Sequence, residues 1–173
     1  MDNSLRYPIG HLQLPTGPLE PAGREPYLRQ IAELPARLTA AAREVGGVRL
    51  EQPYRPGGWN GRQLIHHVAD SHLNAYVRFK LALTEDTPTV RPYDEAAWAE
   101  LPDVAATPVT VSLALLEALH TRWGVLLRHL DEARWQRTFY HPGTQKEFTL
   151  EQALVLYAWH GQHHLAHLEL LNH

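Results

Sequence analysis

The chain of 173 residues contains no cysteine. Disulfide bonds, thiolate metal sites and cysteine nucleophiles are therefore excluded, and any metal ion must be bound by nitrogen and oxygen ligands. No apolar run approaches the roughly 18–20 residues that a membrane-spanning helix needs, and the N-terminus lacks the charged-then-apolar pattern of a signal peptide. We therefore expect a cytoplasmic protein without membrane contact.

An excess of basic charge is also missing. Lys and Arg number 16 against 19 Asp and Glu, which gives a formal net charge of −3. Because a basic stripe that follows a phosphate backbone is not expected, we predict no nucleic-acid partner. The length suits one domain with a full-sized core, so we treat residues 1–173 as a single domain.

Histidine, by contrast, is abundant. The chain has 12 histidines, which is about three times ordinary usage. They are clustered, in segments 66–72 and 160–167. Histidine clusters in a cysteine-free chain indicate metal binding before any other role.

The first half of the chain predicts an arm and two helices. Residues 1–25 are rich in proline and predict an extended arm over the surface. A first helix is expected over residues 26–45, where Pro35 should kink or split it. A second helix should start at Asn60, whose side chain can form a capping box with Gln63, and continue to about residue 83 at helical spacing.

The second half predicts two further helices. Residues 85–110 are broken by prolines and indicate a long ordered connection, with one short turn near residues 94–100. A third helix covers residues 111–130, residues 140–144 form a turn that suits a small hairpin, and a fourth helix runs from Thr149 to about residue 171. Four amphipathic segments with almost no strand alternation predict an all-α four-helix bundle, with a connection between the second and third helices long enough to cross it.

The fourth helix carries two pairs of histidines spaced by four residues. Such residues lie about 40° apart around the helix axis and about 6 Å apart along it. Either His160 with His164 or His163 with His167 can therefore share one ion. His160 and His164 lie on the face of the apolar stripe, whereas His163 lies off it, closer to solvent. Direction favours the first pair, but two ligands alone make a weak site.

The second helix offers a third ligand, with three candidates. His66 points away from the apolar stripe, and His72 lies within it, where a packed histidine is the alternative. His67 lies on a polar seam beside the core, together with Ser71, Asn74 and Arg78. Such a seam is typical of residues that face a cavity in a bundle. Periodicity favours His67 only modestly and leaves His72 as the second choice.

Other features have simpler interpretations. A His-Glu-x-x-His protease carries its general base directly after the first ligand, but Gly161 occupies that position here, which disfavours a metalloprotease mechanism. Trp59 is expected to anchor the start of the second helix. Surface or capping roles are expected for the isolated histidines, which are His120, His129, His141 and His173.

Two motifs carry a family resemblance. They are Tyr54-Arg-Pro-Gly-Gly-Trp-Asn-Gly-Arg-Gln-Leu-Ile-His-His-Val-Ala-Asp-Ser-His72 and Trp159-His-Gly-Gln-His-His164. Together they resemble the DinB-like superfamily, and most closely its YfiT-type metal-dependent hydrolases. Leu5-Arg-Tyr-Pro-Ile-Gly10 and Leu81-Ala-Leu-Thr-Glu-Asp86 are similar to that subfamily too. The likeness therefore spans nearly the whole chain.

The resemblance implies both a fold and a site. The implied fold is a four-helix bundle with an up-down-down-up order. The implied site holds one divalent metal ion per chain, zinc first and nickel second, through a histidine eight residues after a tryptophan and a later His-x-x-x-His pair. Counting from Trp59 gives His67, and the later pair corresponds to His160 and His164. The resemblance also implies a cytoplasmic homodimer.

Three imidazoles with an open position are typical of a catalytic metal site. A water molecule in that position would have its pKa lowered toward about 7 and would become a nucleophile. The leading hypothesis is therefore a metal-dependent hydrolase that acts on a small molecule. Asp70 or another carboxylate near the cavity is a candidate base. Arg78 is a candidate for binding an anionic substrate group, with a solvated surface arginine as the alternative.

Two other functions remain open. The same open position would bind a thiol as thiolate, and a related branch of the family resembles S-transferases that use bacillithiol or similar thiols. The third hypothesis is a metal-binding, stress-related protein without turnover, or a dimeric interaction module. Leu73, Val77 and Leu81 form a second apolar face of the second helix, which is either a dimer contact or part of a crowded core.

Overall fold

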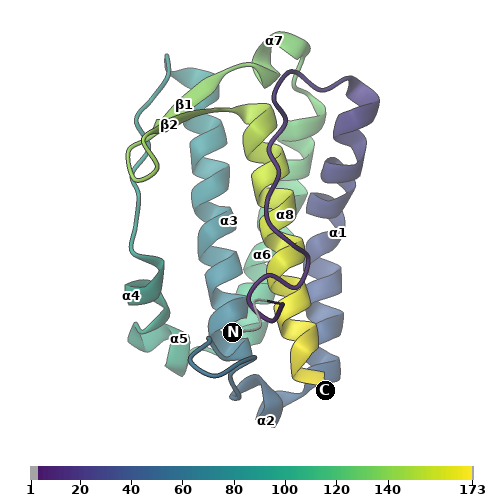
Figure 1. Cartoon of the computed structure of the whole chain (residues 1–173), viewed down its shortest axis with the longest axis vertical. Coiled ribbons are helices and arrows are strands. Elements are labelled where there is room, and N and C mark those ends of the chain that lie inside the picture. Colours follow the sequence, from purple (N-terminus) through teal and green to yellow (C-terminus); the bar gives the residue numbers. More distant parts are fainter. Residues whose placement is uncertain (1–3, 173) are drawn as a thin grey trace.

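The computed structural model describes residues 4–172 (Figure 1). The long helices of the bundle are α1 (Pro21–Val45), α3 (Gly61–Thr84), α6 (Val109–Arg128) and α8 (Leu150–Glu169). Short helical segments lie in the connections and after α8: α2 (Gly47–Leu50), α4 (Glu95–Ala99), α5 (Pro102–Ala106), α7 (Glu132–Trp135) and the 3-10 turn η1 (Leu170–Asn172). The strands are β1 (Thr138–His141) and β2 (Lys146–Thr149).

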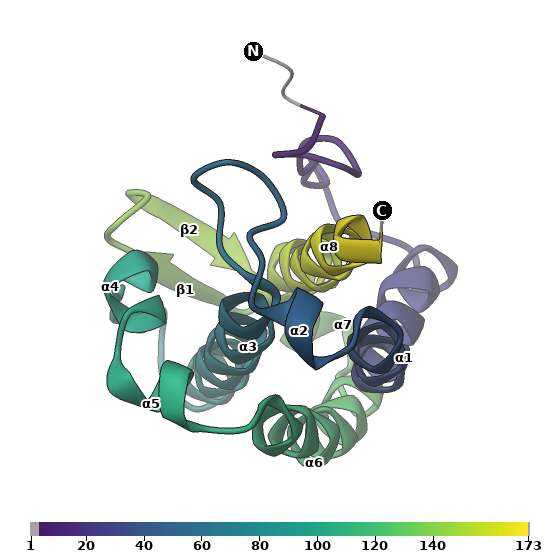
Figure 2. The same ribbon diagram turned by 90° about the horizontal axis from the view of Figure 1, so that it is seen from below.

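The order of the helices is up-down-down-up, as predicted. Helices α3 and α6 run in one direction, and α1 and α8 run in the other (Figures 1 and 2). Helix α1 packs against α6 and α8, and α3 packs against the same two helices. Because α3 and α6 are parallel neighbours, the chain between them returns along the length of the bundle, and α4 and α5 lie on this return.

Helix α1 begins earlier than the sequence predicts. It starts at Pro21, so the arm ends before residue 25. Pro21 occupies the first turn, where a missing N–H has no helical partner to lose. Pro35 leaves the Ile31 carbonyl without its helical donor, but the ring of His120 on α6 supplies one, with Nδ1 2.6 Å from that oxygen. The helix is therefore not split at Pro35.

Two capping boxes set the start of the helices that carry the histidine clusters. The Asn60 side chain accepts from the Gln63 N–H at 2.8 Å, and the Gln63 side chain accepts from the Asn60 N–H at 3.1 Å. Thr149 and Gln152 form the same pair of bonds, at 3.1 and 3.2 Å. Both predicted boxes are present, and they fix where α3 and α8 begin.

The predicted turn at residues 140–144 lies in a hairpin. Strands β1 and β2 are antiparallel, with Phe139 opposite Phe148. The connection after α3 joins this hairpin, because the Val90 N–H donates to the Tyr140 carbonyl and the Tyr140 N–H donates to the Pro88 carbonyl, both at 2.9 Å. The hairpin and the long connection therefore form one wall beside α3 and α8.

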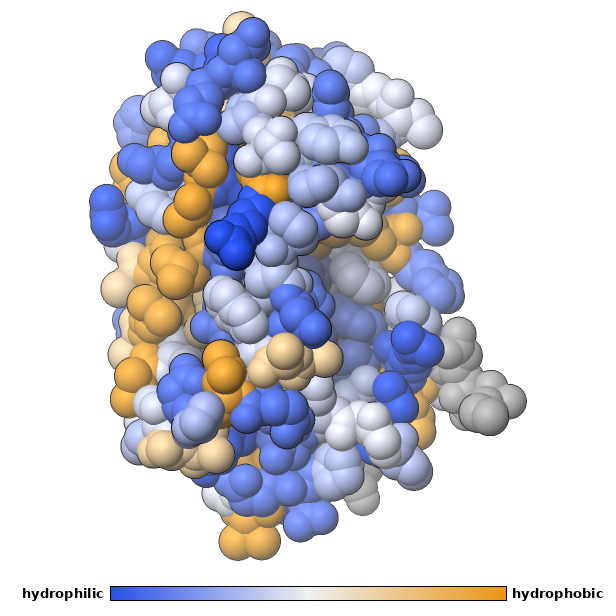
Figure 3. Space-filling model, turned by 90° about the vertical axis from the view of Figure 1, so that its left-hand side faces the viewer, coloured by the Kyte–Doolittle hydropathy of each residue, from blue (hydrophilic) through white to orange (hydrophobic). Residues whose placement is uncertain are grey.

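The second apolar face of α3 is exposed. The side chains of Leu73 and Val77 are 41% and 47% exposed, and Leu81 is half-buried. Figure 3 shows apolar side chains gathered along one edge of the face of the molecule that includes α4 and the hairpin. Since Leu73 and Val77 are exposed and not in the core of the chain, the crowded-core interpretation is wrong, and a dimer contact stays a prediction.

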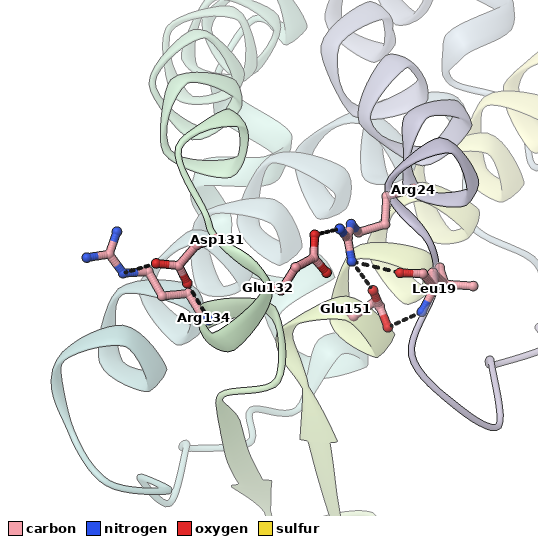
Figure 4. A network of polar contacts seen from close by, with 6 residues as sticks. All are labelled: Leu19, Arg24, Asp131, Glu132, Arg134 and Glu151. Atoms are coloured by element: carbon pink, nitrogen blue, oxygen red, sulfur yellow. Dashed lines mark hydrogen bonds and ion pairs between the residues drawn. The ribbon is translucent and has the colours of Figure 1, made fainter.

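A buried ion pair holds the arm against the bundle (Figure 4). The Arg24 guanidinium donates to Glu151 at 2.7 Å and to the Leu19 carbonyl at 2.9 Å, and it also contacts Glu132 of α7. The second carboxylate oxygen of Glu151 accepts from the Leu19 N–H at 2.8 Å. Because these hydrogen bonds compensate the buried charges, the arm is tied to α1, α7 and α8.

Helices α1 and α8 approach each other closely at Gly161. A Cβ atom at this position would lie 2.4 Å from Cδ2 of Leu34. The close approach of Leu34 therefore explains why glycine occupies the position after His160.

Within residues 4–172, no single helix has the length and apolar character of a membrane span. One pair of segments, Glu95–Ala106 and Val109–Arg128, meets that test only when taken together, and it is bent by 114°.

Candidate metal centre

His67 of α3 meets His160 and His164 of α8 inside the bundle. One ring nitrogen from each lies within 4.8 Å of the other two, and the Nε2 atoms of His67 and His160 are 3.1 Å apart. Nitrogen ligands at zinc distances in a tetrahedral site lie about 3.3 Å from one another. The structure thus brings together the three histidines that the sequence singles out, at a spacing that suits one ion.

The three rings are held in a neutral, shielded environment. His67 and His164 are 5% and 9% exposed, and the Trp59 ring lies 4.7 Å from the His67 ring. Burial lowers the pKa of His67 to about 4. Burial, followed by the neighbouring histidines, lowers the pKa of His160 and His164 as well. Neutral imidazole is the form that binds a metal ion, so the donor set fits a divalent cation.

The alternative pair on α8 is buried too, which corrects the expectation that His163 lies near solvent. His163 is 7% exposed because the Trp159 ring stacks on it at 4.4 Å and Tyr7 of the arm lies 5.9 Å away. His167 is 2% exposed, and its Nε2 lies 3.2 Å from the Arg6 carbonyl oxygen. Helical periodicity predicted neither burial, because the N-terminal arm, a distant segment, covers these two rings.

The other candidates on α3 face different neighbours. His66 contacts the Ser112 hydroxyl at 2.7 Å and the Thr107 carbonyl at 3.2 Å, next to α6. His72 is fully buried, with its Nε2 3.3 Å from His160 and its Nδ1 2.9 Å from His120. His72 is therefore a packed core histidine that nevertheless touches a residue of the cluster.

The four isolated histidines lie in different environments. His120 is 3% exposed, so the surface role expected for it is wrong. His129 lies at the surface, where its ring contacts the Val125 carbonyl at 2.8 Å. His141 lines a cavity described below, and His173 lies outside the described residues.

A cavity of about 250 Å³ adjoins His160. Two residues of the predicted seam, Ser71 and Arg78, line it, while the Asn74 side chain turns back to the Asp70 carbonyl. The hairpin and the long connection supply an aromatic and polar wall, which includes Phe139, Phe148, Tyr93 and Glu95. A second cavity of about 250 Å³ adjoins His164 and Trp59, under the arm.

Arg78 is the cation of the first cavity. It is 9% exposed, so the interpretation as a solvated surface arginine is wrong. Its guanidinium donates to the Tyr157 hydroxyl at 2.7 Å and to the Arg91 carbonyl at 3.3 Å. Within residues 4–172, no carboxylate forms an ion pair with it. A positive charge without a direct counter-ion therefore borders the cavity.

The carboxylate that lines this cavity is Glu95 and not Asp70. Glu95 therefore corresponds to the second alternative for the base, another carboxylate near the cavity. Asp70 lies outside both cavities, and burial together with Asp103 raises its pKa to about 6. Partial burial raises the pKa of the Glu95 carboxyl, although the Arg78 charge opposes this shift. Glu95 sits in a proline-broken segment without a clear period, so no sequence pattern connected it with the histidines.

A helical bundle of this order, with a three-histidine cluster between two of its helices, is the arrangement of a metal-binding helical-bundle protein. The profile of the DinB superfamily matches residues 30–168, and the chain belongs to this superfamily.

Individual relatives are similar over nearly the full length. The chain is 47% identical to a Bacillus subtilis protein named "Putative metal-dependent hydrolase YfiT", over 98% of this chain and 94% of that one. It is 49% identical to a Bacillus pumilus protein named "Putative metal-dependent hydrolase", over 95% and 93%. The solved structure of YfiT superposes with a TM-score of 0.93 at 48% identity, covering 97% of this chain and 95% of that one. It is described as "a probable metal-dependent hydrolase with an unusual four-helix bundle topology".

Proposed function

We propose that the protein is a metal-dependent hydrolase of small molecules, with a divalent ion held by His67, His160 and His164. The observation that carries the proposal is the convergence of three neutral imidazoles beside a cavity that also holds a buried cation. Three protein ligands leave one position of a tetrahedral site open, as in catalytic sites. When bound, the ion supplies Lewis acidity and lowers the pKa of its water toward about 7. Imidazole suits both zinc and nickel, and we propose zinc as the first candidate and nickel as the second.

The residues of the cavity define a substrate class. Arg78 offers its remaining N–H groups to an anionic group of the substrate, while the Tyr157 hydroxyl holds the guanidinium in place. Phe139 and Phe148 give the cavity an apolar side. We therefore infer a small ester, amide or related electrophile that carries both a negative charge and an apolar part.

Glu95 is assigned the role of proton acceptor for the attacking water. It is the carboxylate that lines the cavity of His160, and its pKa is raised by partial burial. A carboxylate with a raised pKa is a stronger base than an ordinary one, and general bases work best when their pKa lies near the working pH. Glu95→Gln should therefore reduce kcat without loss of metal.

The test is a turnover screen with the zinc-loaded and nickel-loaded protein. The panel contains esters and amides with and without a carboxylate or phosphate group, and model electrophiles with bacillithiol. Arg78→Met should raise KM for the charged substrates and leave the neutral ones unchanged, whereas Arg128→Met, in a different cavity, should change neither. Metal-dependent consumption of the thiol without hydrolysis would overturn the proposal in favour of S-transfer. Metal binding without any turnover would favour the non-enzymatic hypothesis.

A further inference from the structure

A chain of contacts between histidine rings runs from the metal centre to the far side of the bundle. The Nδ1 atom of His160 lies 3.3 Å from Nε2 of His72, and Nδ1 of His72 lies 2.9 Å from Nε2 of His120. The last ring contacts the Ile31 carbonyl through Nδ1, at 2.6 Å. The chain therefore connects α8, α3, α6 and α1, and it leaves Nε2 of His160 facing His67.

The Ile31 carbonyl at the end of the chain determines which ring nitrogen donates in each of these hydrogen bonds. A carbonyl oxygen only accepts, so Nδ1 of His120 carries the hydrogen, and Nε2 of a neutral His120 accepts. His72 then donates through Nδ1 and accepts through Nε2, and His160 donates through Nδ1. This pattern places the lone pair of His160 on Nε2, which is the atom 3.1 Å from Nε2 of His67.

Two features of the core support this pattern. His72 and His120 are 0% and 3% exposed, and neither has a carboxylate among its hydrogen-bond partners within residues 4–172. Burial without a carboxylate partner disfavours the charged form of both rings, so the neutral form is the stable one. Pro35 makes the end acceptor available, because it has no N–H to donate to the Ile31 carbonyl.

A second, shorter chain reaches His164. Nε2 of His167 lies 3.2 Å from the Arg6 carbonyl oxygen and therefore carries the hydrogen. Nδ1 of a neutral His167 then accepts from Nδ1 of His164, 3.4 Å away. The lone pair of His164 is again on Nε2. At both His160 and His164, a backbone carbonyl at the end of the chain determines the tautomer of the ring. The carbonyl belongs to Ile31 in the long chain and to Arg6 in the short one.

We propose that His72, His120 and His167 are positioning residues, which hold His160 and His164 as Nδ1–H tautomers with both Nε2 atoms free for the metal ion. Ligand histidines usually donate their second N–H directly to a carboxylate, a carbonyl or water. Here neutral histidines stand between the ligand and the carbonyl, so these contacts add no negative charge around the ion. The inference rests on the proposed metal centre, and it is independent of whether hydrolysis occurs.

The first experiment reads the tautomers directly. The full chain, labelled with ¹⁵N in the histidine rings and stripped of metal, is studied by long-range ¹H–¹⁵N correlation spectra. We expect hydrogen on Nδ1 of His72, His120, His160 and His164, and on Nε2 of His167. Hydrogen on Nε2 of His160 would overturn the proposal for the long chain, and hydrogen on Nε2 of His164 would overturn it for the short one. This measurement needs neither metal nor activity.

The second experiment measures zinc affinity by competition with a chromophoric chelator. His72→Leu should weaken binding about 10–100-fold, as loss of a residue that orients a ligand does. His72→Gln should recover to within a few-fold of the wild type, because an amide can accept from His160 and donate to His120. The matched control is His66→Leu, which removes a buried, hydrogen-bonded histidine from the same helix and should leave the affinity unchanged.

Circular dichroism of the metal-free variants shows whether the bundle is intact. If His72→Leu does not fold, His167→Leu and His167→Gln provide the same comparison at the shorter chain. A folded leucine variant that binds zinc as tightly as the wild type would overturn the proposal. Absence of turnover in the zinc-loaded wild type, together with the expected tautomers and the expected loss of zinc affinity in the variants, would instead count against the hydrolase function alone.

Discussion

His67 and His160 are separated by 93 residues in the chain, yet their Nε2 atoms lie 3.1 Å apart. Helix α3 brings the first ring to this point and α8 brings the second, and each helix begins at a capping box. The starts of the two helices, rather than a local loop, therefore determine where the rings meet. A site built on helices in this way is more precisely held than one built on loops.

The first prediction concerns removal of a ligand. His164→Ala should reduce the zinc content of protein purified without chelators from about one ion per chain to below about 0.1, because two histidines make a weak site. Elemental analysis by mass spectrometry measures this. His129→Ala, which changes a surface histidine, should keep the wild-type content. A His164→Ala protein that retains a full complement of zinc would show that His164 is not a ligand.

The second prediction concerns the pH dependence of stability. Burial and Asp103 raise the pKa of Asp70 to about 6 in the folded chain, from 3.8. The folded state therefore holds this proton more strongly than the unfolded state, and the free energy of unfolding should fall as pH rises from about 4 to about 6. At pH 7.5 the folded state must hold Asp70 in its disfavoured ionised form, and Asp70→Asn removes that cost. The variant should be more stable by about 1 kcal/mol at this pH, a value reduced because the half-exposed carboxyl is partly screened by solvent.

Urea unfolding of the two proteins at pH 4 and pH 7.5 is the measurement. At pH 4 the wild type and Asp70→Asn should have nearly equal stability. Asp86→Asn, a change at an exposed position after α3, serves as the control and should give no such pH-dependent difference. Equal stabilities of wild type and Asp70→Asn at pH 7.5 would contradict the prediction.

The third prediction concerns the close approach of α1 and α8. Gly161→Ala places a methyl group 2.4 Å from Cδ2 of Leu34, so the helices must separate or Leu34 must move. Such overpacking typically costs about 1–3 kcal/mol. The double variant Gly161→Ala, Leu34→Ala should lose less than the sum of the two single variants. Strict additivity in urea unfolding would show that the two residues do not compete for this space.

The fourth prediction concerns the apolar face of α3. We propose that Leu73 and Val77, which are 41% and 47% exposed, contact a second copy of the chain in a homodimer. A glutamate at both positions would bring like charges into such a contact, so the double variant should sediment as a monomer. Val48→Glu, at a position that is 82% exposed on α2, should sediment as the wild type does. If the wild-type protein sediments as a monomer at micromolar concentration, the proposed homodimer is contradicted.

Sequence reasoning succeeded where the signal was local. Helical spacing and two capping boxes predicted α3 and α8, and the resemblance to the DinB-like superfamily selected His67 from three histidines on one helix. The helix order followed from the same resemblance, and the solved structure of YfiT matches it.

Contacts between segments that are distant in the chain were not predicted from the sequence. Nothing in the pattern around His163 shows that Tyr7 of the arm covers it. A surface or capping role is the expectation for His120 as an isolated histidine, yet its ring is buried and contacts the Ile31 carbonyl, which Pro35 leaves without its helical donor, 89 residues away. Glu95 reaches the cavity only because the long connection folds beside the hairpin. Contacts of this kind depend on tertiary packing, which periodicity does not record.

For the proposed metal site, the placement of the three histidines on α3 and α8 also sets the timing of metal uptake during synthesis. When α3 leaves the ribosome, His67 stands alone and can hold an ion only weakly. The two other histidines follow 93 or more residues later, so tight binding becomes available only after the bundle closes. From then on the proposed ion acts as a clamp between two helices, and the free concentration of that ion contributes to the stability of the fold.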